Sequence, residues 1–214
     1  MLFKNREYGG RKLGEFLLAK NFENPIIIGL PRGGVVTAAE VAKILNCPLQ
    51  VVIVRKIGSP IDPEYGIGAM SEDEKCFFAP AAELFDTESE EVQSIVHTER
   101  EELKRRIKEY RGEELKIPPG RIIIIVDDGL ATGVTASAAA KYLRKFKPQK
   151  LIFAAPVGPR TVHSYLKELC DEIILLETPP HFMGVGSWYD DFKQTTDAEV
   201  LDILKSNKSG DVPE

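Results

Sequence analysis

The sequence is poor in cysteine and histidine, and neither residue type is grouped. Its 214 residues include three cysteines, Cys47, Cys76 and Cys170, which lie far apart and show no CxxC spacing. This pattern indicates neither a disulfide framework nor a zinc site, and each cysteine is expected to be a small buried hydrophobic residue. The three histidines are equally scattered, so we expect no metal site built on histidine.

Long apolar runs and an excess of positive charge are also missing. No apolar stretch approaches the roughly 20 residues needed to cross a bilayer, and the opening segment MLFKNREYGG lacks the apolar core of a secretory signal. We therefore expect a soluble, cytoplasmic protein with no membrane partner. The net charge of −5 and the isoelectric point near 5.4 argue against non-specific binding to nucleic acid.

Two common nucleotide-binding motifs are absent as well. No GxGxxG follows an apolar run, which excludes a Rossmann dehydrogenase, and the P-loop pattern GxxxxGK[ST] does not occur. What the chain does have is a repeated alternation of short apolar runs with helical patterns. This alternation predicts a single α/β domain with a Rossmann-like parallel sheet flanked by helices.

The expected elements follow from this alternation. Buried strands are expected at residues 25–30, 49–56, 122–126, 150–156 and 172–176, and helices at 5–20, 35–45, 135–146 and 161–169. Glycines weaken the first helix, and its function cannot be inferred from its sequence.

The alternation breaks between about residues 58 and 116. Here we expect an inserted hairpin around the acidic turn SEDE, then a charged helix with Thr87 and Glu90 as its capping box. The glycine-rich segment 58–80 fits a closing lid or a static insertion equally well. We expect one domain over residues 1–205, with a small aromatic hood at about 178–193 and a disordered tail at 206–214.

The stretch Arg121–Thr135, RIIIIVDDGLATGVT, carries the strongest functional signal. Its β-branched run predicts a strand buried on both faces, which delivers Asp127 and Asp128 into a turn of small residues. The helix that follows directs the positive end of its dipole at that turn. The turn can therefore bind an anion, and a phosphorylated sugar would satisfy both the turn and the carboxylates. The alternative is that both aspartates only cap a polar turn.

These residues resemble a known family signature. Residues 126–135, VDDGLATGVT, resemble the phosphoribosyl-pyrophosphate (PRPP) motif of the type I phosphoribosyltransferases. Residues 31–34, PRGG, resemble the pyrophosphate loop of that family, and Arg55 with Lys56 resembles a basic pair of some members. The layout as a whole, with its insertion and hood, resembles a bacterial branch of the family, which implies the type I phosphoribosyltransferase fold.

The resemblance also implies a set of binding residues. Asp127 and Asp128 would address the ribose hydroxyls, directly or through Mg²⁺. The pyrophosphate would meet Arg32, Gly33, Gly34, Arg55 and Lys56, with Arg32 and Lys56 stabilising the leaving group in catalysis. The 5-phosphate would lie against Ala131, Thr132, Gly133, Val134 and Thr135. For Arg55 and Lys56, an ordinary solvated strand end remains the alternative.

The acceptor is less well defined. Relatives that act on 6-oxopurines have an acid at the position of Ala131, which disfavours such acceptors. Glu64, Glu72 or Asp73 could supply an acid from the insertion instead. The hood residues Phe182, Trp188, Tyr189 and Asp191 are the candidates for binding the base, although a core or dimer-contact role is the alternative for the aromatic residues.

The resemblance implies that the protein transfers phosphoribose from PRPP to a nitrogenous acceptor, with release of pyrophosphate. The acceptor would be a nucleobase, in nucleotide salvage or metabolism, and the cofactor would be Mg²⁺. The rival hypothesis is a non-catalytic regulatory protein of the same fold that binds PRPP or a nucleotide. A homodimer is left open by the sequence.

Overall fold

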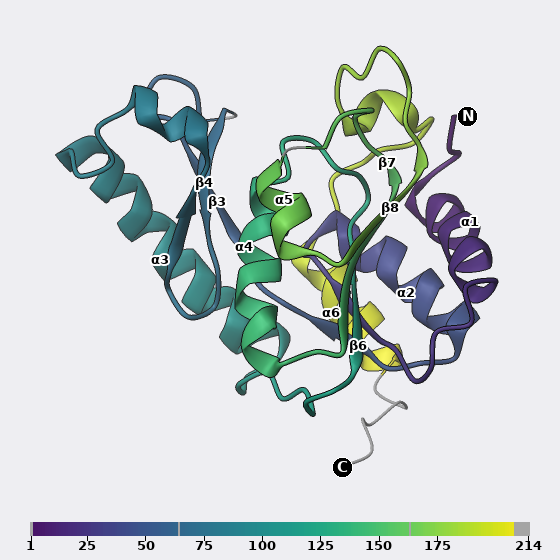
Figure 1. The fold of residues 1–214 in the computed structure, drawn as a ribbon. Coiled ribbons are helices and arrows are strands. Elements are labelled where there is room, and N and C mark those ends of the chain that lie inside the picture. The colour runs from purple at the N-terminus through teal and green to yellow at the C-terminus, as the bar shows by residue number, and fades with distance from the viewer. Residues whose placement is uncertain (1, 64, 163, 208–214) are drawn as a thin grey trace.

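The fold is built on a parallel sheet of five strands. The computed structural model describes residues 2–63, 65–162 and 164–207 (Figure 1). The strand order is β2-β1-β6-β7-β8, and every neighbouring pair is parallel. The strands are β1 (Ile26–Gly29), β2 (Leu49–Val51), β6 (Ile122–Val126), β7 (Lys150–Val157) and β8 (Glu172–Glu177). The predicted α/β fold class is confirmed.

Helices cover both faces of this sheet, which explains why its central strand is apolar throughout. Ile123 and Ile125 of β6 belong to a core shared with α4 (Val134–Leu143) and α5 (Ser164–Leu169). Ile124 and Val126 instead face a core shared with α1 (Arg6–Leu18) and α2 (Gly33–Leu45). Figure 1 shows the two helix pairs on opposite sides of β6. The short helical turn η2 (Arg144–Phe146) extends α4.

The glycines of α1 are packing residues. A Cβ atom added at Gly10 would lie 2.6 Å from the carbonyl oxygen of Thr37, and one at Gly14 would lie 2.9 Å from Cδ1 of Ile44. Both contacted residues belong to α2. The missing side chains therefore let the two helices approach closely, which offsets the low helix propensity of glycine.

The insertion forms a second, antiparallel sheet. Strands β3 (Arg55–Gly58), β4 (Gly66–Met70) and β5 (Cys76–Phe78) lie in that order, and η1 (Pro80–Leu84) and α3 (Glu90–Tyr110) follow. Figure 1 shows this unit projecting beyond α4. The predicted hairpin around SEDE is confirmed.

Two predictions are wrong, one for the strand that leads into the insertion and one for the helix within it. The expected strand 49–56 is two strands, because after Val51 the chain leaves the large sheet and the Ile53 N–H group donates to Glu72 Oε1 at 2.8 Å. The expected capping box of Thr87 is replaced by Ser89, whose hydroxyl accepts from the Val92 N–H group at 3.4 Å. Glu90 is the first residue of the helix, so it cannot close a box begun at Thr87.

The C-terminal region contains a helix that the sequence reading missed. Helix α6 (Asp197–Ser206) begins with a complete capping box between Thr196 and Glu199, and it packs against α2 and α3. Ser206, where the tail is expected to begin, is the last residue of this helix. Residues 208–214 of the expected disordered tail lie outside the described residues. Before α6, the short helical turn η3 (Val185–Trp188) lies in the expected hood.

Over the described residues, the helices are too short or too polar to cross a bilayer.

Candidate functional site

Two adjacent carboxylates lie at the end of β6, the central strand. Strand β6 is paired on both sides, with β1 and β7, and its last residue is Val126. Asp127 Oδ1 accepts a hydrogen bond from the backbone N–H of Asp128 at 2.9 Å. Ligands of open α/β sheets bind at this carboxyl edge of the strands, so the aspartates occupy the position expected of a binding site.

Burial sets the charge state of this pair. Burial raises the pKa of the Asp127 carboxyl well above its ordinary value, and the neighbouring Asp128 carboxylate adds to the rise. Burial also raises the pKa of Asp128, but the Arg6 guanidinium opposes that rise. Asp127 is partly buried, and its ionised form needs a compensating positive charge or hydrogen-bond donor, as is common at functional sites.

The turn after β1 touches both carboxylates. In the sheet, Gly29 of β1 lies beside Val126 of β6, so the two strands end at the same level. A Cβ atom added at Gly34 would lie 2.5 Å from Asp127 Oδ1, and one at Gly33 would clash with Asp128 Oδ2. A side chain at Gly33 would displace the Asp128 carboxylate and Arg6, and one at Gly34 would also press on the backbone of Asp127. The Pro31–Arg32 peptide bond is cis.

The predicted anion loop precedes α4. Gly133 has a φ of +80°, a conformation that favours glycine, and the helix begins directly after it at Val134. Ala131 and Thr132 are exposed, whereas Gly133 and Val134 are buried. The Tyr165 hydroxyl of α5 donates to the carbonyl oxygen of Thr132 and so holds the loop. The loop thus presents the amino end of a helix to the carboxyl edge of the sheet.

Arg6 is a member of the site that the sequence reading missed. It is the first residue of α1, and its Nε atom donates to Asp128 Oδ2 at 2.6 Å. Gly10 and Gly14 lie on one face of α1 and would have indicated close packing of that helix. Nothing in the sequence indicated that this packing would bring Arg6 to Asp128.

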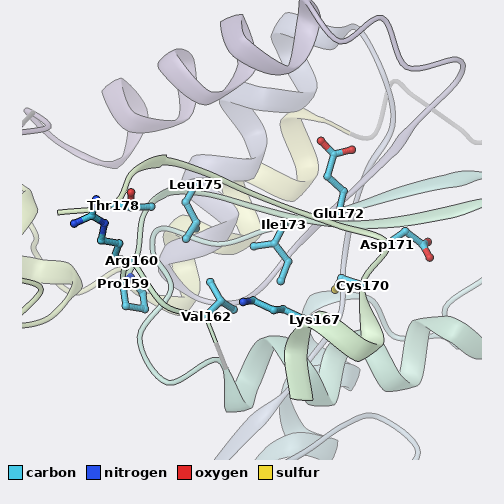
Figure 2. A pocket seen from close by; sticks show the side chains of 10 residues that line it. All are labelled: Pro159, Arg160, Val162, Lys167, Cys170, Asp171, Glu172, Ile173, Leu175 and Thr178. Carbon is cyan, nitrogen blue, oxygen red and sulfur yellow. The ribbon is translucent and has the colours of Figure 1, made fainter. Parts of the chain in front are cut away.

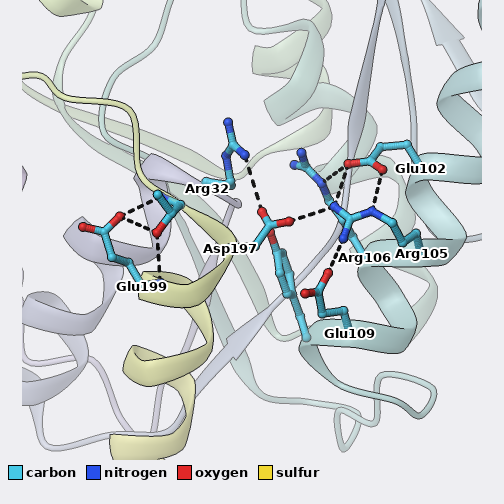
Figure 3. Close-up of polar contacts among 9 residues, drawn as sticks. Arg32, Glu102, Arg105, Arg106, Glu109, Asp197 and Glu199 are labelled. Atoms are coloured by element: carbon cyan, nitrogen blue, oxygen red, sulfur yellow. Dashed lines mark hydrogen bonds and ion pairs between the residues drawn. The ribbon is translucent and has the colours of Figure 1, made fainter.

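Arg32 is held on a network of charged side chains (Figure 3). Its Nη1 lies 3.5 Å from Asp197 Oδ1 of α6, and Arg105 Nη2 of α3 lies 2.8 Å from Asp197 Oδ2. The hydroxyl of Tyr110 also donates to Asp197. Burial raises the pKa of Asp197, but hydrogen bonds from Tyr110 and Arg105 and nearby arginines lower it more, to about 2. Helices α3 and α6 thereby anchor the residue expected to meet pyrophosphate.

Arg55 and Lys56 lie in the insertion. They begin β3, outside the five-stranded sheet, and line a cavity of about 630 Å³ together with Ser94 and Thr98 of α3. Arg55 Nε donates to Glu99 Oε2 at 2.6 Å. Arg55 therefore has a partner within the insertion. The single strand expected at 49–56 would not have placed it there.

Two of the candidate acids of the insertion face away from the anion loop. Glu72, only 4% exposed, pairs with Arg111, and Asp73 pairs with Lys145. Lys145 follows the carboxyl end of α4, whereas the anion loop precedes its amino end. A helix of 10 residues separates these ends by about 15 Å. Glu64, the third candidate, lies outside the described residues.

The aromatic residues of the hood form a small core above the carboxylates. Tyr189 is buried, packs on Phe3 and Phe192 at centroid distances of 5.5 and 5.1 Å, and donates its hydroxyl to the carbonyl oxygen of Asp128. Phe182 and Trp188 are partly buried against this cluster. Tyr189 thus holds the carboxylate turn, and its packing favours the alternative of a core role.

Two further features connect the hood to its surroundings. Val185 is so close to Gly129 that a Cβ atom added there would clash, which places the hood directly on the turn after the two aspartates. Asp191 is exposed, and its Oδ2 lies 3.2 Å from Lys193 Nζ. Its carboxylate therefore has a surface partner within the hood.

A separate pocket of about 420 Å³ lies between β8 and α5 (Figure 2). Its lining includes Arg160, Lys167 and Cys170, and none of the residues predicted for the site. Burial raises the pKa of the Cys170 thiol to about 12, so this cysteine stays protonated near neutral pH and is unreactive. Cys170 is thus the small buried residue expected from the sequence, whereas Cys47 and Cys76 are only partly buried.

Asp127 and Asp128 are the side chains that could contact a metal ion at this site. Within the residues that the structure describes, no group of three or more histidine, cysteine or acidic side chains could hold a metal ion alone. Mg²⁺ is commonly bound by one or two carboxylates together with substrate phosphates. Asp127 and Asp128 are two such carboxylates, and a cation would favour the ionised form of Asp127, which burial disfavours.

The fold and the site define the class of protein: an α/β domain with an anion loop, a glycine turn and a carboxylate pair at one edge of its parallel sheet. Within that class, residues 3–177 match the family described as the phosphoribosyl transferase domain. The chain therefore belongs to the phosphoribosyl transferase family, as its sequence motifs predicted.

Relatives and solved structures agree with this assignment. A protein of Mycobacterium tuberculosis that carries the name putative phosphoribosyl transferase is 38% identical over 205 residues, which cover 95% of this chain and 46% of that protein. The chain thus spans about half the length of this relative. The crystal structure of TT1426 from Thermus thermophilus is 36% identical, with a TM-score of 0.78 and coverage of 97% of this chain and 99% of that one.

A more distant structure shares the fold alone. It is a hypothetical protein from Neisseria gonorrhoeae with bound ppGpp, which is 12% identical with a TM-score of 0.50. The alignment covers 96% of this chain and 98% of that one.

Proposed function

We propose that the protein is a Mg²⁺-dependent phosphoribosyltransferase that moves phosphoribose from PRPP to a nitrogenous acceptor and releases pyrophosphate. The observation that supports this most strongly is the meeting of three segments at one edge of the sheet. Asp127 and Asp128 lie against Gly33 and Gly34 of the turn after β1, and the anion loop follows the same aspartates along the chain.

Each segment matches one part of PRPP. The amino end of α4 favours the 5-phosphate, with the hydroxyls of Thr132 and Thr135 as further donors. The two carboxylates suit the ribose hydroxyls as hydrogen-bond acceptors. The turn that contains Arg32 lies at the amino end of α2, which favours the pyrophosphate.

Catalysis in such a site consists of positioning and charge neutralisation. Displacement at C1 of the ribose proceeds with bond breaking ahead of bond making, so the sugar becomes cationic and the pyrophosphate gains negative charge. Arg32 stabilises the departing group, and the two carboxylates hold the ribose. When bound, Mg²⁺ supplies further positive charge to the pyrophosphate oxygens. Lys56 and Arg55 stabilise the negative charge of the pyrophosphate only if the insertion closes over the ligand, as a lid does.

The acceptor is proposed to be a nucleobase other than a 6-oxopurine. Ala131 offers no acid to such a ring. The hood supplies partly buried aromatic surface at Phe182 and Trp188, and the indole Nε1 of Trp188 is buried without a hydrogen-bond partner among the described residues. A planar acceptor could stack on the partly buried ring of Phe182 or Trp188.

The decisive test is incubation with PRPP, Mg²⁺ and a panel of nucleobases, with pyrophosphate and nucleoside monophosphate as the measured products. We expect product with at least one base. Binding of PRPP without pyrophosphate release across the panel would contradict transfer and support the regulatory hypothesis.

Variants of the carboxylates test the binding assignment. Asp127→Asn and Asp128→Asn should each weaken PRPP binding by about tenfold or more, because charged hydrogen bonds contribute about 1.5–3 kcal/mol. Asp73→Asn is the matched control at the far end of α4. Unchanged affinity in both site variants would refute the assignment.

A further inference from the structure

The Arg6 side chain joins three segments of the chain at the carboxylate pair. Its Nε lies 2.6 Å from Asp128 Oδ2, and one of its Nη atoms donates to the carbonyl oxygen of Lys193 at 2.6 Å. The guanidinium carbon lies 3.8 Å from the centre of the Phe192 ring. The side chain is only 11% exposed. Arg6 is therefore fixed by an anion, a carbonyl group and an aromatic face together.

The position of Arg6 matters because the proposed ligand is strongly anionic. Two adjacent carboxylates would repel a phosphorylated ligand at the same edge of the sheet. The charge of Arg6 balances that of Asp128, so the pair carries one negative charge fewer. Arg6 also lies next to the pyrophosphate turn, because a Cβ atom added at Gly33 would lie 2.6 Å from Arg6 Nε.

We propose that Arg6 is a positioning residue that reserves Asp128 for the ribose of PRPP. Arg6 engages Oδ2 of Asp128, which leaves Oδ1 to accept from a ribose hydroxyl and makes Asp128 a poorer metal ligand than Asp127. The inference rests on the proposed function and deepens it, since it states how the first helix and the hood act on the same site. Tyr189, which holds the Asp128 carbonyl oxygen, fixes the backbone of the same residue.

The test compares Arg6→Met with Arg6→Lys in PRPP binding, measured by isothermal titration calorimetry with Mg²⁺ present. Arg6→Met removes the charge, and the PRPP affinity should fall by about tenfold to 100-fold. Arg6→Lys keeps the charge but loses the planar fork, and the loss should be about tenfold or less. Circular dichroism of both variants establishes that they are folded.

The matched control is Arg11→Met. Arg11 lies on the same helix and pairs with Glu40 of α2 at 3.0 Å, away from the carboxylates. Its loss should leave PRPP affinity within about twofold of the wild type, because its exposed pair makes only a small contribution.

A double-mutant cycle separates positioning from a general loss of structure. If Arg6 acts through Asp128, Arg6→Met should cost PRPP affinity less than about threefold in an Asp128→Asn background. Binding of Mn²⁺ without PRPP, followed by electron paramagnetic resonance, gives a second readout. Arg6→Met should bind Mn²⁺ several-fold more tightly than the wild type because Asp128 is released, and a purely structural role would not produce this gain.

The outcomes distinguish the two proposals. If the wild type binds PRPP and Arg6→Met binds it equally well, the inference alone is overturned. The same holds if Arg6→Met causes an equally large loss of PRPP affinity in the Asp128→Asn background. Failure of the wild type to bind PRPP overturns the proposed function and the inference with it. Weaker PRPP binding, a strong coupling to Asp128 and tighter Mn²⁺ binding together support both.

Discussion

The carboxylate site and the inserted hairpin both contain acidic residues, but these residues differ in whether the protein provides a positively charged partner. In the insertion, Glu72 pairs with Arg111 and Asp73 with Lys145. At the end of β6, burial raises the pKa of Asp127 well above its ordinary value. The acids of the insertion thus have protein cations as partners, whereas burial favours the neutral form of Asp127, and a ligand donor or metal ion would favour its carboxylate. The comparison teaches that an acid poorly compensated by the protein marks the binding site better than acidity alone.

The largest expected effect tests the structural half of this comparison. Glu72→Ala should lower the free energy of unfolding by about 3–5 kcal/mol, because it leaves the mostly buried Arg111 and the Ile53 N–H group without their carboxylate. Urea denaturation measures the change. Glu72→Gln, which keeps an acceptor for Ile53, should cost less. A loss below about 1 kcal/mol in the alanine variant would contradict a structural role for this buried pair.

Asp197 is an intermediate case, because its network supports Arg32. Its pKa is lowered from 3.8 to about 2, so it stabilises the folded protein above pH 4, and this stability is lost as the pH falls through the folded-state value. Asp197→Asn should cost about 2 kcal/mol at pH 7, and the difference from the wild type should shrink towards pH 2. Thermal unfolding from pH 2 to 7 measures it. A difference that did not change with pH would break the electrostatic explanation.

Asp127 should show the opposite sign. Because its pKa is raised in the folded state, the folded protein binds more protons than the unfolded chain, and its contribution to stability falls as the pH rises above about 4. Asp127→Asn should therefore raise the free energy of unfolding more at pH 7 than at pH 4, while it weakens PRPP binding. Chemical denaturation at pH 4 and pH 7 tests this. A destabilised variant at pH 7 would place Asp127 among the structural acids.

The smallest effect is expected at Asp73. Its pair with Lys145, whose side chain is 45% exposed, is screened by solvent, so Asp73→Asn should change the free energy of unfolding by less than about 1 kcal/mol. The pair is also remote from the anion loop, and we expect unchanged PRPP affinity. A tenfold loss of affinity would show that the tip of the hairpin takes part in binding.

Much of the fold could be predicted because its signals are local. The five β-branched residues of β6, the small residues of the turn and the helix former alanine in α4 lie within one short stretch. The same holds for β1 with its glycine turn. The capping box at Thr87 was wrong because Ser89 offers an equivalent hydroxyl two residues later, and a sequence pattern alone does not choose between such neighbouring caps.

The insertion was harder to predict for a different reason. Arg55 and Lys56 directly follow an apolar run, which favours one continuous strand. Where the chain leaves the large sheet, the Ile53 N–H group donates to Glu72, which follows β4. A local sequence pattern cannot show this hydrogen-bond partner, because the folded hairpin brings it near. The pattern therefore predicts a strand that is too long.

The sequence by itself therefore determined the α/β alternation, the carboxylate pair, the glycine turn and the anion loop, because each depends on residues close together in the chain. The tertiary structure alone decided which side chains complete the site. Arg6 reaches Asp128 across 122 positions of sequence, and Arg32 meets Asp197 across 165. The close packing of α1 on α2, made possible by glycine, and the docking of the hood and α6 bring these residues together. Contacts of this kind follow from the packing of whole elements, which no local pattern of residues encodes.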